Sequence, residues 1–149
     1  MHVIKPAASF QIDYLQYLGP DGTPVREFPA ALRDPAVLLP LFKRMLYARH
    51  FDTKAIALQR TGKLGTYAPC LGHEATHVGI GAAMAPDDVY APSYREYGIL
   101  FERGVQPREV LLYWGGDERG NDFQQGAARH DFPFCVPIST QCLHAAGAA

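Results

Sequence analysis

The chain carries a phenol and a guanidinium on neighbouring residues, Tyr94 and Arg95, within the segment PSYREYG. The apolar residues 89–91 that come before it are typical of a short strand, which Pro92 would end. A helix is predicted over residues 94–102, so the unpaired N–H groups of its first turn would lie beside both side chains. A phenol, a planar cation with five donors and a helix start can together bind a phosphate or diphosphate. The alternative is that the two side chains only cap and pack the helix.

A second candidate for chemistry is His73-Glu74-x-x-His77, which satisfies the H-E-x-x-H pattern of zinc hydrolases. Within a helix the two imidazoles would share one face, and Glu74 would act as the general base. However, Gly72 and Pro69 place His73 at or before the helix start, and no spacing in the sequence selects a third ligand. The alternative role of Glu74 is to stabilise the helix N-terminus by its charge. A zinc hydrolase is therefore a rival function that bound zinc would reveal.

The composition excludes several classes of partner. The 149 residues carry a formal net charge of −1. A protein that binds nucleic acid by neutralising phosphates would show a basic excess, so no nucleic-acid partner is expected. No apolar run is long enough to cross a bilayer, and the first residues lack the features of a signal or transit peptide. The three cysteines fit no zinc-binding spacing. A cytoplasmic protein with reduced thiols and no membrane partner is therefore expected.

The elements that must position these groups are mainly helical. A long amphipathic helix is predicted to begin after the N-cap Asp34, with a start or a kink at Pro40, and to end at Gly62. The polar, Gly-rich residues 117–133 are predicted to form a long loop. Ser139 is expected to cap a last, closely packed helix. The other predicted helices cover residues 74–84, 94–102 and 107–114.

The first 33 residues are predicted to form an extended N-terminal arm. Residues 10–18 are aromatic and partly alternating, and residues 19–22 (GPDG) have the composition of a turn. An arm of this kind has little core of its own. We therefore expect it to lie across a neighbouring or partner subunit.

The motifs along most of the chain resemble the alpha subunit of the thiamine-diphosphate-dependent decarboxylating component of 2-oxo acid dehydrogenase complexes, of the pyruvate or branched-chain type. The similarity covers about residues 10–149, and several motifs agree in order and spacing. These motifs are LQRTGK at 58–63, YAP at 67–69, GHEA at 72–75, YREYG at 94–98, RGV at 103–105 and WGG at 114–116.

The resemblance implies roles for particular residues. In that family the Tyr-Arg dipeptide binds the cofactor diphosphate, which implies this role for Tyr94 and Arg95. Ile138 would form a wall against the aminopyrimidine ring of thiamine diphosphate. Thr140 and Gln141 resemble a monovalent-cation site of some members, but a helix cap is favoured there.

The resemblance also implies an α/β fold, the thiamine-diphosphate-binding fold, in which a parallel sheet carries helices on both faces. Residues 1–33 would be the arm, and residues 34–149 would be the N-terminal part of the diphosphate-binding domain, incomplete at its C-terminus. The family's Gly-Asp-Gly motif, which holds Mg²⁺, is absent from this chain. The last helix also lacks the residues that usually end a helix. A truncated fold is therefore expected, in a fragment without the Mg²⁺ ligands.

The function implied for the parent protein is decarboxylation of pyruvate and transfer of the acetyl group to a lipoyl-bearing dihydrolipoyl acyltransferase. In the family a beta subunit completes the site within a heterotetramer. The 149-residue chain alone is expected to be inactive. A branched-chain 2-oxo acid as substrate is the first alternative. The alternatives from other classes are the zinc hydrolase and a non-catalytic interaction fragment.

Overall fold

The computed structural model describes residues 4–149, which divide into two compact units. One unit ends at Val37, and the other covers Leu38–Ala149. The first unit is extended over most of its length. Its turn is closed by a hydrogen bond from the Gly22 N–H to the Gly19 carbonyl (2.9 Å), beside an isolated bridge between Leu18 and Pro24. The short 3-10 helix η1 (Ala30–Leu32) follows this turn.

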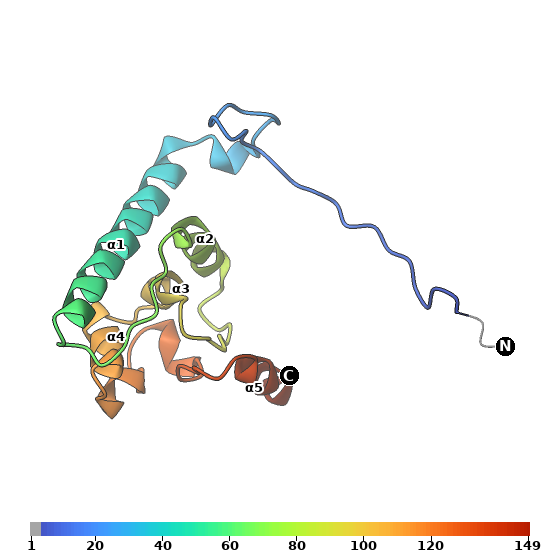
Figure 1. Cartoon of the computed structure of the whole chain (residues 1–149). Coiled ribbons are helices and arrows are strands. Elements are labelled where there is room, and N and C mark those ends of the chain that lie inside the picture. Colours follow the sequence, from blue (N-terminus) through green and yellow to red (C-terminus); the bar gives the residue numbers. More distant parts are fainter. Residues whose placement is uncertain (1–3) are drawn as a thin grey trace. The chain divides into compact units, whose positions relative to one another are not determined.

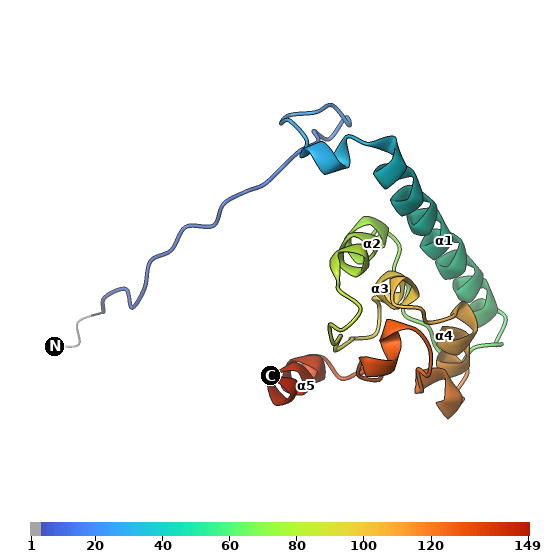
Figure 2. The same ribbon diagram turned by 180° about the vertical axis from the view of Figure 1, so that it is seen from behind.

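The α-helices are labelled in Figure 1 and are seen from behind in Figure 2. None of them, within residues 4–149, combines the length and apolarity that a bilayer span requires. The connection between α4 and α5 contains two 3-10 helices, η2 (Glu118–Asn121) and η3 (Ala127–His130). The α-helices are α1 (Pro35–Arg60), α2 (Glu74–Ala83), α3 (Tyr97–Glu102), α4 (Pro107–Trp114) and α5 (Thr140–Ala148).

The prediction of an α/β fold with a parallel sheet is wrong for the part of the chain that the structure describes. This part is 48% helix and 1% strand. Residues 89–91, which were predicted to form a strand, lack a paired strand. The Tyr90 N–H instead donates to Asp131 Oδ1, and the Tyr90 carbonyl accepts from the Phe132 N–H, both at 2.9 Å. A carboxylate and one amide thus satisfy this peptide without a ladder, because strand propensity alone supplies no neighbouring strand.

Local signals set most helix boundaries. The Asp34 carboxylate accepts from the Ala36 N–H (2.8 Å) at the start of α1, and Pro40 stays inside that helix without ending it. In α4 the Glu109 carboxylate accepts from the Gln106 N–H (2.6 Å), one half of a capping box. The predicted start of the third helix is wrong. α3 begins at Tyr97, three residues later than expected.

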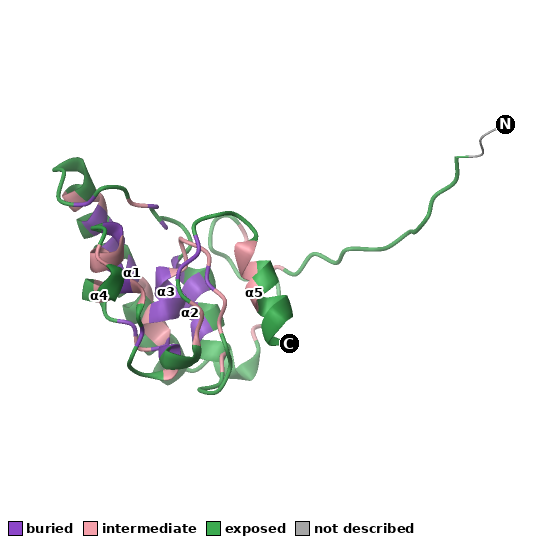
Figure 3. Ribbon diagram, turned by 90° about the horizontal axis from the view of Figure 1, so that it is seen from below, coloured by how far each residue is buried: buried purple, intermediate pink, exposed green. Residues whose placement is uncertain are grey.

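Helices α2 and α3 pack closely because glycine lies at their crossing. A Cβ added at Gly98 would lie 2.6 Å from the His77 Cβ, and one at Gly81 would lie 2.5 Å from the Glu102 Cβ. Four residues of α3, 97–100, are buried, whereas α5 has no buried residue, as the purple and green ribbons in Figure 3 show.

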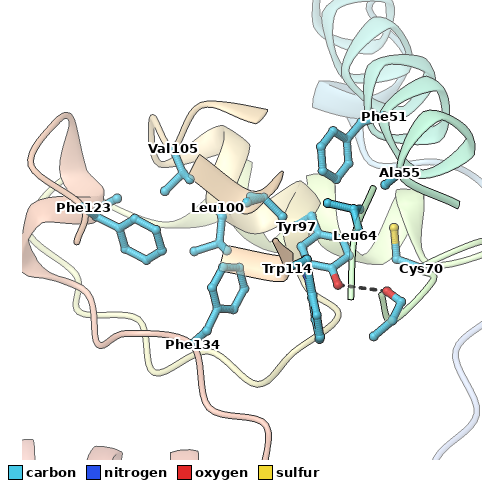
Figure 4. Close-up of a cluster of buried hydrophobic side chains, with 13 residues drawn as sticks. Phe51, Ala55, Leu64, Cys70, Tyr97, Leu100, Val105, Trp114, Phe123 and Phe134 are labelled. Atoms are coloured by element: carbon cyan, nitrogen blue, oxygen red, sulfur yellow. Dashed lines mark hydrogen bonds between the residues drawn. The ribbon is translucent and has the colours of Figure 1, made fainter. Parts of the chain in front are cut away.

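The core of the second unit surrounds Tyr97 and Leu100 of α3, which are 0% exposed. Aromatic rings form much of it, and Figure 4 shows Phe51, Trp114 and Phe134 around these two residues. The Phe51 ring lies edge-on to the Tyr97 ring at a centroid distance of 5.8 Å. Large rings give α1, α3 and α4 a shared apolar contact area, which stabilises their packing.

A buried ion pair joins three segments of this unit. The side chains of Arg103, directly after α3, and of Asp131 are 2% and 0% exposed, and Arg103 Nε lies 2.5 Å from Asp131 Oδ2. Arg103 Nη2 also donates to Asp131 Oδ1 (2.7 Å) and to the carbonyl oxygens of Asp88 and Ala127. Asp131 in turn accepts from the Tyr90 N–H. The pair therefore holds the chain before Tyr94 against the end of η3.

Replacing Arg103 with methionine should lower the free energy of unfolding by about 3–5 kcal/mol, because Asp131 would remain buried without its cation. The matched control is Arg119→Met, which removes the partner of Asp117 from an ion pair whose arginine side chain is 75% exposed. The control should cost far less, because both charges of that pair stay exposed to water. Urea denaturation measures both values. Equal losses would show that the buried pair does not hold these segments.

Candidate functional site

Tyr94 and Arg95 lie in a bend before α3, not in its first turn. The Tyr97 N–H, at the helix start, already donates to the Arg95 carbonyl (3.0 Å). The helix therefore begins after the pair and not at it, and a contribution of its N–H groups to ligand binding stays a prediction. The groups of this bend that could contact a ligand are the Tyr94 and Arg95 side chains.

The two side chains contact each other. The Arg95 guanidinium carbon lies 5.1 Å from the centroid of the Tyr94 ring, which is within the range of a cation–π contact. Arg95 Nη1 donates to the Pro69 carbonyl (2.6 Å). Neither the Tyr94 hydroxyl nor the other guanidinium donors form a hydrogen bond with residues 4–149, and no carboxylate there pairs with Arg95. A half-buried cation and a phenol with unused donors fit an anionic diphosphate.

Tyr97 is buried and contacts the backbone of this pair. Its side chain is 0% exposed, and its hydroxyl lies 2.9 Å from the Ala68 carbonyl and 2.8 Å from the Tyr94 carbonyl. The first of these hydrogen bonds is drawn as a dashed line in Figure 4. Burial raises the pKa of the Tyr97 hydroxyl, so it stays a neutral donor. Tyr97 thus packs and does not line an open pocket.

A loop after α1 supplies the carbonyl groups that meet these side chains. Asp52 of α1 is 1% exposed, and its Oδ1 accepts from the Tyr67 hydroxyl (2.8 Å) and the Cys70 N–H (2.9 Å). The Cys70 thiol is buried, and this burial raises its pKa, with the Asp52 charge adding to the effect. The sequence reasoning missed Asp52. A charge within the buried stripe of Ala48, Phe51 and Ala55 was the available signal.

No hydrogen bond or ion pair within residues 4–149 joins Ile138 to Tyr94 or Arg95. Ile138 lies in the turn before α5 with 79% of its surface exposed. The next residue, Ser139, has φ 70° and makes no side-chain cap, contrary to expectation. A cavity of about 600 Å³ lies nearby in the sequence: its lining includes Trp114 and Val136, two residues before Ile138. The role of Ile138 as a cofactor wall stays a prediction.

The H-E-x-x-H motif is arranged for packing. His73 precedes the first residue of α2, as predicted, and its ring centroid lies 5.3 Å from that of the buried His77. The Glu74 carboxylate accepts from Arg49 Nε (2.5 Å) and from the Gly72 N–H (3.0 Å). No cluster of three metal-ligating side chains exists within residues 4–149. Glu74 therefore ties α2 to α1 and to its own N-terminus.

The fold and the site define a helical protein in which a guanidinium and a phenol lie side by side at a bend before α3. Residues 42–149 match the family described as "Dehydrogenase E1 component". The chain belongs to this family, which depends on thiamine diphosphate. The family predicted from the sequence motifs is thereby confirmed.

Several curated relatives are alpha subunits. The chain is 39% identical over 142 residues to the 3-methyl-2-oxobutanoate dehydrogenase subunit alpha of Mycobacterium tuberculosis, covering 95% of this chain and 38% of that protein. It is 41% identical over 112 residues to the pyruvate dehydrogenase E1 component subunit alpha of Acholeplasma laidlawii, covering 75% and 32%. For the Staphylococcus aureus counterpart the identity is 30% over 139 residues, covering 93% and 37%. The chain thus spans less than two-fifths of these relatives.

The zinc hypothesis makes a direct prediction. Purified protein should contain only substoichiometric zinc, and His77→Ala should leave that content unchanged, because Glu74 is bonded to Arg49 and residues 4–149 supply no third ligand. Elemental analysis after dialysis measures this. One bound zinc per chain that His77→Ala removes would reinstate the hydrolase.

Acid should weaken the fold through His77. Burial, with the nearby charge of His73 adding to it, lowers the pKa of His77 from 6.5 to about 4. Between these values the unfolded chain binds the proton and the folded chain does not, so stability is full above pH 6.5 and falls towards pH 4. The loss should reach about 2–3 kcal/mol, as measured by urea denaturation across this range. In His77→Gln this part of the pH dependence should disappear.

A second loss should begin at lower pH. The Arg49 hydrogen bond lowers the pKa of Glu74 from 4.5 to about 2. Its contribution is therefore present above pH 4.5 and is lost as the pH falls towards 2. Glu74→Gln should remove this step while it leaves the His77 step in place. A single transition unaffected by either variant would contradict both assignments.

Proposed function

We propose that this chain is part of an E1 alpha subunit that binds thiamine diphosphate through Tyr94 and Arg95. The observation that carries the proposal is the guanidinium of Arg95, which stacks on the Tyr94 ring and has one hydrogen bond within residues 4–149. A cation that keeps most of its donors unused at a half-buried bend can pair with a diphosphate oxygen. Membership of the E1 family supports the same ligand.

Three residues would contact different parts of the cofactor. Arg95 would neutralise part of the diphosphate charge, the Tyr94 hydroxyl would donate a hydrogen bond to it, and Ile138 would offer an apolar wall. When bound, thiamine diphosphate supplies the carbanion chemistry of decarboxylation. We propose that Mg²⁺ is held by residues that this chain does not contain.

The reaction we propose for the whole protein is oxidative decarboxylation of pyruvate with transfer of the acetyl group to a lipoyl group. Relatives named as pyruvate dehydrogenase alpha subunits, from Acholeplasma, Mycoplasma and Staphylococcus, support pyruvate as the substrate. The Mycobacterium relative is named for a branched-chain 2-oxo acid, 3-methyl-2-oxobutanoate, and supports the alternative substrate. Both substrates are small 2-oxo acids, so the proposed chemistry is the same.

The proposed partners follow from this assignment. A beta subunit of the same component would complete the site in a heterotetramer, and a lipoyl-bearing dihydrolipoyl acyltransferase would accept the acyl group. The exposed side chains of the arm, such as Phe10, Ile12 and Tyr14, are 82–85% exposed and would be covered by a neighbouring subunit. We further propose a cytoplasmic location, and residues 1–33 and 34–149 as the two domains.

Arg95→Gln should weaken the binding of thiamine diphosphate to this chain by about tenfold or more, because a charge-assisted hydrogen bond is lost. Isothermal titration calorimetry at low salt measures the affinity. The matched control is Arg60→Gln, which removes the same charge from an exposed position at the end of α1. Equal affinities of the two variants would exclude Arg95 as the diphosphate ligand.

A further inference from the structure

We infer that Asp52 is a positioning residue for the Tyr94–Arg95 pair and acts through the loop from Tyr67 to Cys70. This inference rests on the proposed function of that pair. Asp52 touches neither side chain of the pair through a hydrogen bond or ion pair. Its effect passes through backbone carbonyl groups of the loop.

Asp52 holds the loop at both of its ends. One carboxylate oxygen, Oδ1, accepts from the hydroxyl of Tyr67 at 2.8 Å and from the N–H of Cys70 at 2.9 Å. These two residues lie at the two ends of the loop. A single buried acceptor thus fixes both ends relative to α1, and the two residues between them have little freedom to turn.

The two residues between these ends, Ala68 and Pro69, accept hydrogen bonds from Tyr97 and Arg95. The Ala68 carbonyl accepts from the Tyr97 hydroxyl at 2.9 Å, and the Pro69 carbonyl accepts from Arg95 Nη1 at 2.6 Å. The direction of the Pro69 carbonyl therefore sets where one edge of the guanidinium points. The donors that Arg95 keeps for a ligand point accordingly, since the guanidinium is planar and rigid.

Burying a carboxylate at this position is unfavourable for folding. Asp52 is 1% exposed, and its second oxygen, Oδ2, is buried without a hydrogen-bond partner in residues 4–149. Its buried neighbours on α1 are apolar, among them Phe51 and Ala55. An apolar residue would pack at this position without the desolvation penalty. What the carboxylate adds is the fixed geometry of the loop.

The test uses the whole chain without ligand and then with inorganic diphosphate. The Nε–Hε signal of Arg95 is followed by NMR and is assigned by its absence in Arg95→Lys. Asp52→Ala should shift this signal towards that of an exposed arginine, and Asp52→Asn, which keeps an acceptor oxygen, should restore it. The control is Val78→Ala in α2, a buried truncation outside the network, which should leave the signal in place.

The second measurement is the affinity for inorganic diphosphate. Asp52→Ala should weaken it by about tenfold, whereas Val78→Ala should not change it. An Arg95 signal that is unchanged in Asp52→Ala, or that shifts equally in Val78→Ala, would overturn the positioning role. If Asp52→Ala does not fold, Tyr67→Phe removes one of the two hydrogen bonds to Asp52. An unshifted Arg95 signal in that variant would also overturn the positioning role.

The failure of the proposed function gives a different result. If Arg95→Lys and Arg95→Gln both bind diphosphate as tightly as the original chain, the pair is not the diphosphate site. The ligand-free shift in Asp52→Ala would still establish that Asp52 orients Arg95. The two outcomes are therefore separable.

Discussion

The buried ion pair between Arg103 and Asp131 is the contact that holds the chain leading to the Tyr94–Arg95 bend. It lies at the end of α3, and its two side chains are almost fully removed from solvent. Arginine suits this position because its planar group bonds the carboxylate through two nitrogens and still donates to the carbonyl groups of Asp88 and Ala127. The chain that leads to Tyr94 is thereby anchored at Asp88 and Tyr90.

A second buried acidic residue anchors the opposite side of the site. Asp52 holds the loop whose carbonyl groups meet Tyr97 and Arg95. The Tyr94–Arg95 bend therefore lies between two polar anchors, one from α1 and one from the end of α3. Buried polar groups that are bonded in this way specify one arrangement of the backbone. An apolar core of the same size fixes the backbone less strictly. The proposed ligand site would benefit from that specification, because the bend has no helical hydrogen bonds of its own.

The two histidine-motif residues that looked catalytic contribute to stability instead. Glu74 joins α2 to α1 through Arg49, and His77 lies against Gly98 where α2 crosses α3. The same residue types could bind zinc only if a third ligand met them, and the packing of α3 against α2 occupies the space beside His77. A short motif states which side chains share a face, whereas the neighbouring helix decides what that face contacts.

The sequence by itself determined the family, the adjacency of Tyr94 and Arg95, and the helices whose signals are local. α4 begins at its proline and ends before its glycine as predicted, because capping and period depend on residues only a few positions apart. Tertiary structure alone decided the start of α3, the lack of a sheet in residues 4–149 and the two polar anchors. Arg103 and Asp131 are 28 residues apart, and Arg95 and Pro69 are 26 apart. Contacts over such separations form only when helix packing brings the segments together, and no local pattern encodes them.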